Sequence, residues 1–271
     1  MGNIKRISFL FIVLSLGFQA QAQRCGACII KGDIVIDFAY SFEQRYEMNS
    51  VMKFPQAIYV AHYLDSCGIS LDQRVTVKKQ DLEQSTWSPM LKMIDEEREF
   101  SYGQLLALSL QHSDNNACDL LFKLCGGPKD VQNYVRNLGF KNIRLKWTEK
   151  QMHSKPRRAR DNWCTPRDMA ELLEWFYCKK QSSPVLMYIW DLMLRCETGN
   201  NRIKAALPPV ATLAHKTGTG FSKGKTLKGI NDVGIVVMPD GDGDVYPIAI
   251  FIKRTKREEE VAEIAKILLS P

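Results

Sequence analysis

A serine and a lysine stand three positions apart at the start of an apolar helical pattern, in the segment Ser50-Val51-Met52-Lys53. Residues at this spacing share one face of a helix, so the lysine amine can reach the serine hydroxyl. A serine hydroxyl is a weak nucleophile unless a base lies beside it, and a partly desolvated lysine can be that base. S-x-x-K also arises by chance, so the motif alone only suggests a nucleophile at Ser50.

Two further polar clusters lie downstream. Ser113-Asp114-Asn115 separates two helical patterns, and Lys216-Thr217-Gly218-Thr219 stands at the end of a strand pattern. The second cluster offers a cation, a hydroxyl and a close backbone approach, which suits a substrate carboxylate and amide. Each cluster also has a plain structural interpretation, the first as a helix N-cap and the second as a strand that runs into a loop.

The elements that must position these clusters follow from hydrophobic periodicity. Apolar residues at three- and four-residue spacing predict helices over residues 51–65, 102–111, 114–124, 129–138, 166–178 and 184–195. Pro55 would lose the backbone hydrogen bond to the carbonyl of Val51. The first helix is therefore expected to start near Ser50 with an irregular turn.

Strand patterns occur at both ends of the chain. They cover residues 26–30, 34–39, 212–216, 233–238 and 248–253, followed by a last helix over about 257–269. Residues 239–244 are expected to form a hairpin loop. The pattern predicts an α+β fold in which an antiparallel sheet, built from both termini and flanked by helices, carries an inserted all-helical lobe. The expected α/β lobe covers residues 23–48 and 208–271, and the helical lobe covers 49–207.

The first 22 residues have the pattern of a secretory signal. Lys5 and Arg6 precede an apolar run over 7–18, and Ala20-Gln21-Ala22 is a small-x-small cleavage pattern. We therefore expect export to the periplasm, with a lipid anchor on Cys25 as the weaker alternative. The apolar run is too short for a membrane span, and no later segment is long enough for one.

Charge and cysteine content narrow the function classes. Removing residues 1–22 lowers the formal net charge from +7 to +5, and the basic clusters 155–160 and 253–257 hold no aromatic residues. Nucleic-acid binding is therefore not expected. The eight cysteines leave their pairing open, and Cys25 and Cys28 lack a second pair for a zinc site. Neither a metal nor a cofactor is expected.

Together the three clusters follow the order and context of one known motif set: S-x-x-K at a helix start, S-D-N in an interhelical loop, K-T-G at a strand end. With them the sequence resembles the class A serine β-lactamases, in particular their extended-spectrum cephalosporinase branch. The likeness extends from about Gly26 to the last helix, and includes Gln84 to Pro89, Ser113 to Leu121, and Glu197-Thr198-Gly199 ahead of Leu207-Pro208. It implies one catalytic domain over residues 23–271, a monomer that hydrolyses penicillins and cephalosporins.

The resemblance also implies roles for single residues. Ser50 would be the nucleophile and Lys53 its proton partner, and Ser113 would pass a proton to the lactam nitrogen. The backbone amides of Ser50 and Thr219 would form the oxyanion hole. The residues implied to hold the substrate are Asn115 for the acyl amide, Lys216, Thr217, Gly218 and Thr219 for the carboxylate, Arg202 as a second cation, and Trp87 as an apolar wall.

Glu149 separates hydrolysis from transpeptidation in this interpretation. It lies in the segment Trp147 to His153, where the family has an Ω-shaped loop, and a carboxylate there can activate the water that hydrolyses the acyl-enzyme. His153 stands where many members have an asparagine that helps to hold the water. Trp147 replaces the arginine whose salt bridge often holds the loop, which leaves the loop conformation open.

A second departure lies at the N-terminus. The family usually begins with a helix beside the last helix, whereas here the expected signal runs almost directly into the first strand. An uncovered apolar surface is therefore expected. Two alternatives remain: a D,D-peptidase or penicillin-binding enzyme that uses Ser50, and a non-catalytic periplasmic binding protein on the same scaffold.

Overall fold

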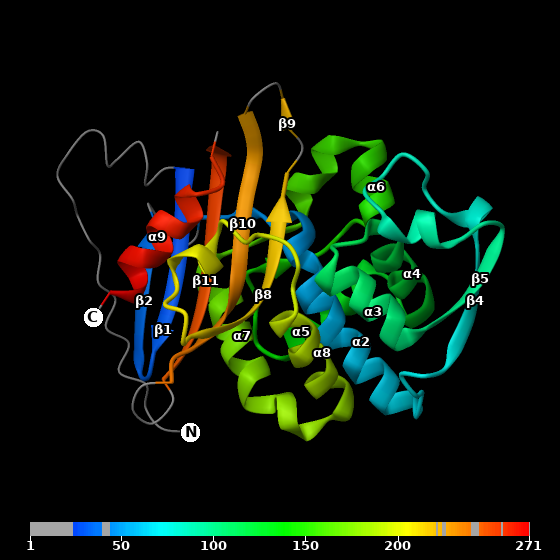
Figure 1. The fold of residues 1–271 in the computed structure, drawn as a ribbon, viewed down its shortest axis with the longest axis horizontal. Helices are drawn as coiled ribbons and strands as arrows, with labels where there is room; N and C mark the ends of the chain where they lie inside the picture. Colours follow the sequence, from blue (N-terminus) through cyan, green and yellow to red (C-terminus); the bar gives the residue numbers. More distant parts are fainter. Residues whose placement is uncertain are drawn as a thin grey trace.

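An antiparallel sheet forms one side of the molecule in the computed structural model (Figure 1), which describes residues 24–39, 44–220, 222–223, 226–239, 244–255 and 257–270. Its strand order is β2-β1-β11-β10-β8, and β9 pairs with β10. The strands are β1 (Cys25–Lys31), β2 (Ile34–Ala39), β8 (Thr212–Thr219), β9 (Ser222–Lys223), β10 (Thr226–Val237) and β11 (Val245–Thr255). Because β1 pairs with β11, the predicted sheet built from both ends of the chain is confirmed.

The predicted helices are also confirmed, with boundaries within a few residues. They are α2 (Lys53–Cys67), α3 (Tyr102–Gln111), α4 (Asn115–Cys125), α5 (Pro128–Asn137), α7 (Pro166–Lys179), α8 (Pro184–Leu194) and α9 (Glu260–Leu269). A further helix that the periodicity did not predict, α6 (Glu149–Ser154), begins at the predicted catalytic glutamate. Most of these helices lie beside the sheet on the β8 side (Figure 1).

Two short sheets accompany the helices of the inserted lobe, which is therefore not purely helical. One contains β3 (Tyr46–Glu47), β7 (Trp163–Cys164) and β6 (Ile143–Arg144), and the other pairs β4 (Arg74–Lys78) with β5 (Glu97–Ser101). Two-residue strands carry no readable alternation, and β4 and β5 are largely exposed and charged. β5 lacks the alternating pattern by which strands are recognised, whereas β4 alternates polar and apolar residues over Arg74–Lys78, a signal that the sequence analysis did not use.

Short 3-10 helices complete the framework. They are η1 (Asn49–Met52), η2 (Lys79–Asp81), η3 (Pro89–Met93), η4 (Pro156–Asp161), η5 (Lys180–Ser182) and η6 (Ile203–Ala206). The first of them, η1, leads directly into α2 and is the irregular first turn that Pro55 predicted.

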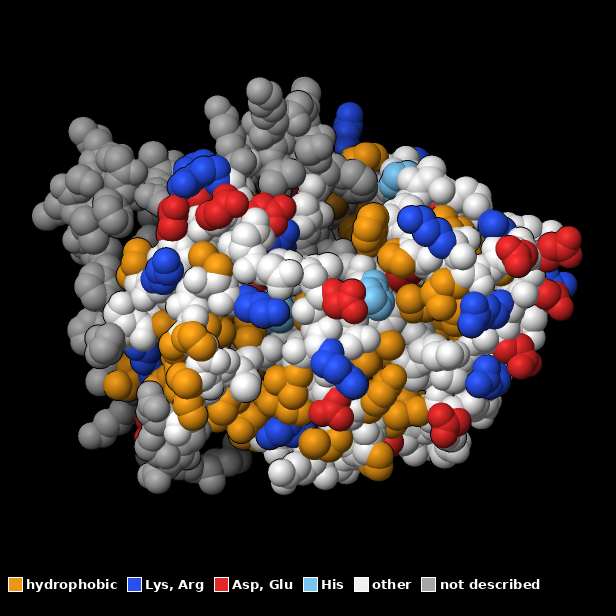
Figure 2. All heavy atoms as spheres, viewed as in Figure 1, with side chains coloured by type: hydrophobic (Ala, Val, Ile, Leu, Met, Phe, Trp, Pro, Cys, Tyr) orange, Lys and Arg blue, Asp and Glu red, His pale blue; other side chains and the backbone are white. Residues whose placement is uncertain are grey.

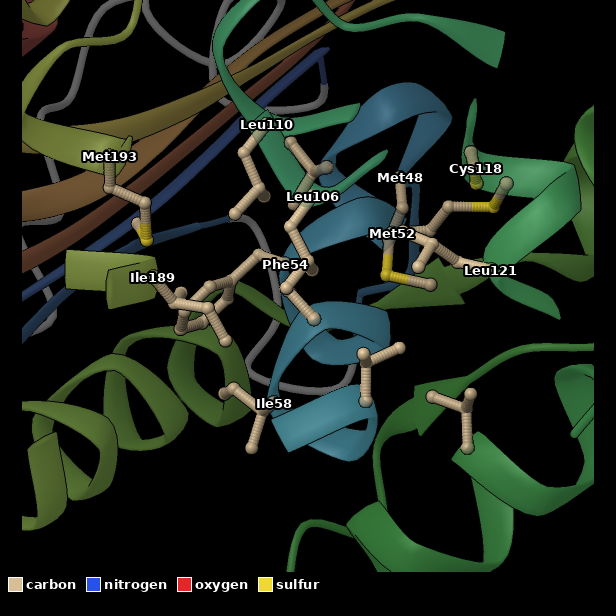
Figure 3. Close-up of a cluster of buried hydrophobic side chains, with 14 of the residues drawn as sticks. Met48, Met52, Phe54, Ile58, Leu106, Leu110, Cys118, Leu121, Ile189 and Met193 are labelled. Carbon is tan, nitrogen blue, oxygen red and sulfur yellow. The ribbon is translucent and has the colours of Figure 1, made fainter. Parts of the chain in front are cut away.

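Helix α2 runs through the main hydrophobic core (Figure 3). Phe54 and Ile58 point toward Ile189 of α8, whereas Met52 lies near Leu121 of α4. The inner face of the sheet packs on α7, which contacts β1, β10 and β11. This continuous core fixes η1 and α4 relative to the sheet, so the three polar clusters are attached to one rigid frame.

A second cluster of buried side chains lies on the outer face of the sheet. Val261, Ala265 and Leu268 of α9 pack there against strand residues. Among the described residues, α9 and η6 cover this face, and Ile267 of α9 is 66% exposed. The predicted signal at 1–22 and most of the predicted hairpin loop, residues 240–243, lie outside the described residues. No described helix combines the length and hydropathy needed to cross a bilayer.

Candidate active site

Ser50 and Lys53 lie at the junction between η1 and α2, where the backbone turns sharply. Asn49 has a positive φ of 49°, and Lys53 is the first residue of the α-helix. Lys53 Nζ donates to Ser50 Oγ at 2.9 Å. The predicted proximity of the two side chains on one helix face is therefore present in the structure.

The Lys53 ammonium lies at the centre of a buried polar network. Its nitrogen also donates to Asn115 Oδ1 at 2.8 Å and to Glu149 Oε1 at 2.5 Å. Burial by itself lowers the pKa of Lys53, but the charge and hydrogen bond of Glu149 outweigh it and leave the pKa above its ordinary value. Lys53 is therefore an ammonium in the resting site, with all three donors occupied.

Glu149 faces the same serine from α6. The Ser50 hydroxyl donates to Glu149 Oε1 at 3.4 Å, so one hydroxyl contacts both members of the ion pair. Thr148 caps this helix and accepts from Gln151 N. Asp119 of α4 accepts from the backbone amides of Glu149 at 2.8 Å and Lys150 at 2.7 Å. These contacts hold the carboxylate beside the nucleophile.

Contacts of Trp147 and Asn162 hold the loop around Glu149. Trp147 Nε1 donates to Asp161 Oδ2 at 2.9 Å, and the Arg158 guanidinium lies 4.2 Å from the centre of the Trp147 ring. The buried Asn162 side chain accepts from the backbone amides of Lys146 and Trp147 and donates to the carbonyl of Trp147. Trp147 and Asn162 thus anchor this loop through their own contacts.

The Ser113-Asp114-Asn115 cluster combines a structural and a site role. Asp114 is the N-cap of α4, accepts from Ala117 N and is fully buried, so the ordinary N-cap interpretation holds for this residue. Ser113 has a positive φ of 58°, which turns the chain into the site. Asn115 donates to Thr86 Oγ1 at 2.8 Å while it accepts from Lys53.

The β8 cluster approaches Ser50 from the sheet. Lys216 Nζ donates to Ser113 Oγ at 3.0 Å and is fully buried, behind the pocket wall rather than on it. Burial is the main cause that lowers the pKa of Lys216, to about 7. A Cβ atom at Gly218 would lie 2.6 Å from the Met48 carbonyl oxygen, so only glycine lets β8 approach η1 this closely.

Arg202 is a positioning residue in this structure rather than a free cation. It is 4% exposed, and its guanidinium contacts Glu258 Oε2 at 3.0 Å. It also donates to Thr219 Oγ1 at 2.7 Å and to the carbonyl of Asn231 at 2.8 Å. Arg202 therefore links the segment before α9 to the end of β8.

These side chains surround a pocket of about 590 Å³ between the two lobes. Trp87 is 64% exposed at its rim and donates from Nε1 to the His112 carbonyl. His153 lies near Ser85 Oγ, 3.2 Å from its Nε2. The predicted site residues on the wall are Ser50, Trp87, Ser113, Asn115, Glu149, His153, Arg202, Thr217 and Thr219, whereas Lys53, Lys216 and Gly218 lie behind it.

Some site residues escaped the sequence analysis. Asp119 supports Glu149, Thr86 orients Asn115, and Thr198 Oγ1 lies 2.6 Å from Thr217 Oγ1. Asp119 stands four residues after Asn115 on the same helix, so its position on the site-facing side of α4 was readable from spacing. The other two contacts join distant segments and have no such signal. In the described part of the chain, no group of three or more His, Cys, Asp or Glu side chains could hold a metal ion.

Comparisons with known proteins agree with this geometry. The profile of the β-lactamase enzyme family matches residues 17–270. The chain is 33% identical to the β-lactamase VEB-1 of Pseudomonas aeruginosa over 257 residues, which is 92% of this chain and 85% of that protein. It is 37% identical to the extended-spectrum β-lactamase PER-1 of Pseudomonas aeruginosa, over 81% of this chain and 71% of the relative.

Solved structures show the same fold. A β-lactamase from Chitinophaga pinensis superposes with a TM-score of 0.86 at 30% identity, over 93% of this chain and 95% of the other. The TLA-3 extended-spectrum β-lactamase superposes with a TM-score of 0.85 at 32% identity, over 92% of each chain. Together with the pocket that joins Ser50, Lys53 and Glu149, these matches show that the chain belongs to the class A β-lactamases, the serine enzymes that hydrolyse β-lactams.

Proposed function

We propose that Ser50 is the nucleophile and Glu149 the general base of this enzyme. The observation that carries the proposal is the Ser50 hydroxyl, which donates to the Glu149 carboxylate while it accepts from Lys53. Because Lys53 is already protonated, it cannot take the serine proton as it stands. Its ammonium instead stabilises the developing alkoxide, and Glu149 accepts the proton.

Acylation then opens the lactam ring. Ser50 Oγ bonds to the lactam carbonyl carbon, the carbon–nitrogen bond breaks, and the nitrogen takes a proton from Ser113. The Ser113 hydroxyl accepts from Lys216, which replaces the proton it gives. The proton that Glu149 took from Ser50 then passes by way of Lys53 to Ser113 and Lys216. Glu149 is thereby a carboxylate again. The backbone amides of Ser50 and Thr219 are proposed to bind the oxyanion.

Deacylation uses the same carboxylate. Glu149 takes a proton from a water molecule, the hydroxide attacks the ester carbonyl, and the ester bond to Ser50 Oγ breaks. Glu149 then returns the proton to Ser50 Oγ and is a carboxylate again. His153 lines the pocket four residues after Glu149, and an imidazole can both donate to and accept from such a water. General-base activation of this kind contributes a factor of about 10² to 10⁴ in rate.

The pocket wall supports a β-lactam that carries a carboxylate. Thr217 and Thr219 offer hydroxyl groups to this carboxylate, with the Arg202 guanidinium on the same wall and the buried Lys216 charge behind it. We propose that Asn115, on the same pocket wall, holds the acyl side-chain amide. The exposed Trp87 ring provides an apolar wall at the mouth. We propose penicillins and cephalosporins as substrates, including the bulkier cephalosporins, since relatives such as PER-1 are named extended-spectrum enzymes.

The proposal extends to where the enzyme works and in what form. We propose that residues 1–22 are a cleaved signal, that the mature enzyme is a periplasmic monomer, and that residues 23–271 form one catalytic domain. N-terminal sequencing of the secreted protein should begin at Gln23, and its molecular mass in light scattering should equal that of one chain. An N-terminus at Cys25 would instead support the lipid-anchored alternative.

Mass spectrometry after brief exposure to cefotaxime tests the catalytic roles. Wild type should turn the drug over without a lasting adduct, Glu149→Gln should accumulate an adduct on Ser50, and Ser50→Ala should form none. Glu96→Gln, at an exposed glutamate, is the matched control and should behave as wild type.

Other outcomes support the alternatives. A lasting adduct in wild type would overturn the hydrolytic role of Glu149 in favour of the D,D-peptidase hypothesis. A folded wild-type protein with neither adduct nor turnover would favour the non-catalytic binding protein and would overturn Ser50 as the nucleophile.

A further inference from the structure

A second nucleophilic side chain lies outside the catalytic pocket. Cys196 follows α8, is 6% exposed, and lies on the same cavity wall as the His215 imidazole on β8. His215 Nδ1 lies 2.9 Å from Asp232 Oδ1 on β10. A thiol, an imidazole and a carboxylate thus lie in one region, and these three groups together can activate a cysteine nucleophile.

This thiol faces its own cavity. Cys196 and His215 both line a space of about 500 Å³ that shares no lining residue with the catalytic pocket. Most of its wall is apolar and includes Leu194, Leu207 and Leu213. Figure 2 shows hydrophobic side chains gathered on this face, over α8 and the segment between η6 and β8 that Figure 1 places there. The cavity therefore suits a small apolar molecule.

The charges around Cys196 favour the thiolate. Burial alone raises the pKa of this thiol, but the hydrogen bond and charge of His215 and the charge of Lys216 outweigh burial and lower it to about 7. Burial also disfavours the imidazolium of His215, yet Asp232 raises its pKa to about 10. The other charged groups nearby are Lys204 on the cavity wall and Glu197, which pairs with His112 at 3.1 Å.

No other buried cysteine shares this environment. Burial raises the pKa of the thiols of Cys25, Cys28, Cys118, Cys125 and Cys164. The two remaining cysteines, Cys67 and Cys178, are exposed on the surface. A reagent that enters the apolar cavity therefore meets one activated thiol.

A short chain of contacts joins Cys196 to the catalytic pocket. Its Sγ lies 3.4 Å from Thr198 Oγ1, which lies 2.6 Å from Thr217 Oγ1. The packing here is tight, because a Cβ atom at Gly199 would lie 2.5 Å from the Thr217 methyl carbon. We expect a group added to Cys196 to break its contact with Thr198 and thereby to disturb the contact between Thr198 and Thr217.

We propose that Cys196 is a modification site at which the thiolate attacks a small apolar disulfide held in this cavity, and that the mixed disulfide slows β-lactam hydrolysis. A bond forms between Cys196 Sγ and one sulfur of the reagent, the sulfur–sulfur bond of the reagent breaks, and the second sulfur leaves as a thiolate. No further oxidant is needed. The effect on hydrolysis rests on the proposed role of Thr217 in substrate binding.

Thiol titration with 4,4′-dithiodipyridine tests the site in a Cys67→Ser/Cys178→Ser background. The folded protein should release one equivalent of thiopyridone, and its rate should reach half-maximum near pH 7. Peptide mapping should place the adduct on Cys196, and a further Cys196→Ser change should abolish the reaction. His215→Asn should move the half-maximum toward the pH of about 8.5 of an ordinary thiol.

Two results would overturn the modification site. One is a folded protein in which no thiol reacts before urea is added, and the other is a pH profile of the Cys67→Ser/Cys178→Ser protein centred near 8.5. Both results are measured by thiopyridone release alone. They therefore test the modification site even if the enzyme hydrolyses no β-lactam.

A separate assay tests whether modification of Cys196 slows β-lactam hydrolysis. The labelled enzyme should lose activity by about tenfold, as expected for one disrupted polar contact, and dithiothreitol should restore it. Treated Cys196→Ser enzyme is the matched control and should keep its activity. A fully labelled enzyme with unchanged turnover would overturn the coupling.

Discussion

The ammonium nitrogen of Lys53 and the Oε1 atom of Glu149 lie 2.5 Å apart, and both contact the hydroxyl of Ser50. The lysine side chain is fully buried and the glutamate side chain is 11% exposed, so solvent screens this pair weakly. One protonated and one ionised group thus flank the nucleophile before substrate arrives. The division of roles between them follows from the charge that each already carries.

The first prediction concerns the carboxylate. Glu149→Gln should lower kcat by about 10² to 10⁴, because the amide cannot accept a proton from water. An acylation burst should remain measurable by stopped-flow with nitrocefin, because without the Glu149 charge burial lowers the pKa of Lys53 and lets its amine take the Ser50 proton. If the burst and the steady state fell by equal factors, no acyl-enzyme would accumulate, and Lys53 would not replace Glu149 in acylation.

The second prediction concerns the support beneath Glu149. Asp119→Asn removes one of the acceptors for the amides of Glu149 and Lys150. A lost hydrogen bond to a charged group costs about 1.5–3 kcal/mol, so deacylation should slow by about ten- to hundredfold. Asp130→Asn is the matched control, because Asp130 accepts from the Gly127 amide at the start of α5. Equal effects of the two changes on deacylation would contradict the assignment.

The third prediction concerns the contact between β8 and η1. Gly218→Ala places a methyl group against the Met48 carbonyl and should force Thr219 away from Ser50. Acylation should fall by about 100-fold or more, because misplacing reacting groups by about 1 Å can cost that much. Gly127→Ala is the control, since a Cβ there meets nothing within 4 Å. Near-normal acylation by Gly218→Ala would show that β8 can move without cost.

The fourth prediction concerns pH and the His215–Asp232 pair. The pKa of His215 is raised to about 10 from an ordinary 6.5, so its stabilising effect is complete below pH 6.5 and is lost as pH rises to 10. The free energy of unfolding should therefore differ most between His215 and His215→Asn proteins near pH 6. This gap should shrink toward pH 10.

Urea titrations at about pH 6, 8 and 10 measure this gap. They should be made in a Cys196→Ser background, because Cys196 titrates in the same range. A gap that stays constant or widens with pH would exclude the ion pair as the source of the stability.

The sequence predicted the long elements well because their apolar periodicity extends over several turns. The helix predicted at 102–111 is α3 with the same bounds, and strands β1 and β2 lie where alternation placed them. The two-residue strands β3, β6 and β7 carry no such signal and depend on pairing between distant segments. Such strands become visible only when the chain is folded.

The sequence predicted which residues form the site, but not how deeply each side chain is buried. The motif order identified Ser50, Lys53, Ser113 and Lys216, the family resemblance added Glu149, and the structure brings these residues together. The sequence did not reveal that Lys216 is fully buried, or that Arg202 is paired with Glu258. Burial and pairing are set by tertiary packing, which spacing along the chain does not encode.

The pairing of β1 with β11 also governs when activity can arise. The strand that carries Lys216 and Thr217 pairs with β10, β10 pairs with β11, and β11 pairs with β1. A nascent chain still lacking its last thirty or so residues has no complete sheet against which Ser50 can be set. Catalysis therefore requires β11 to be in place, although none of the predicted catalytic residues lies on that strand.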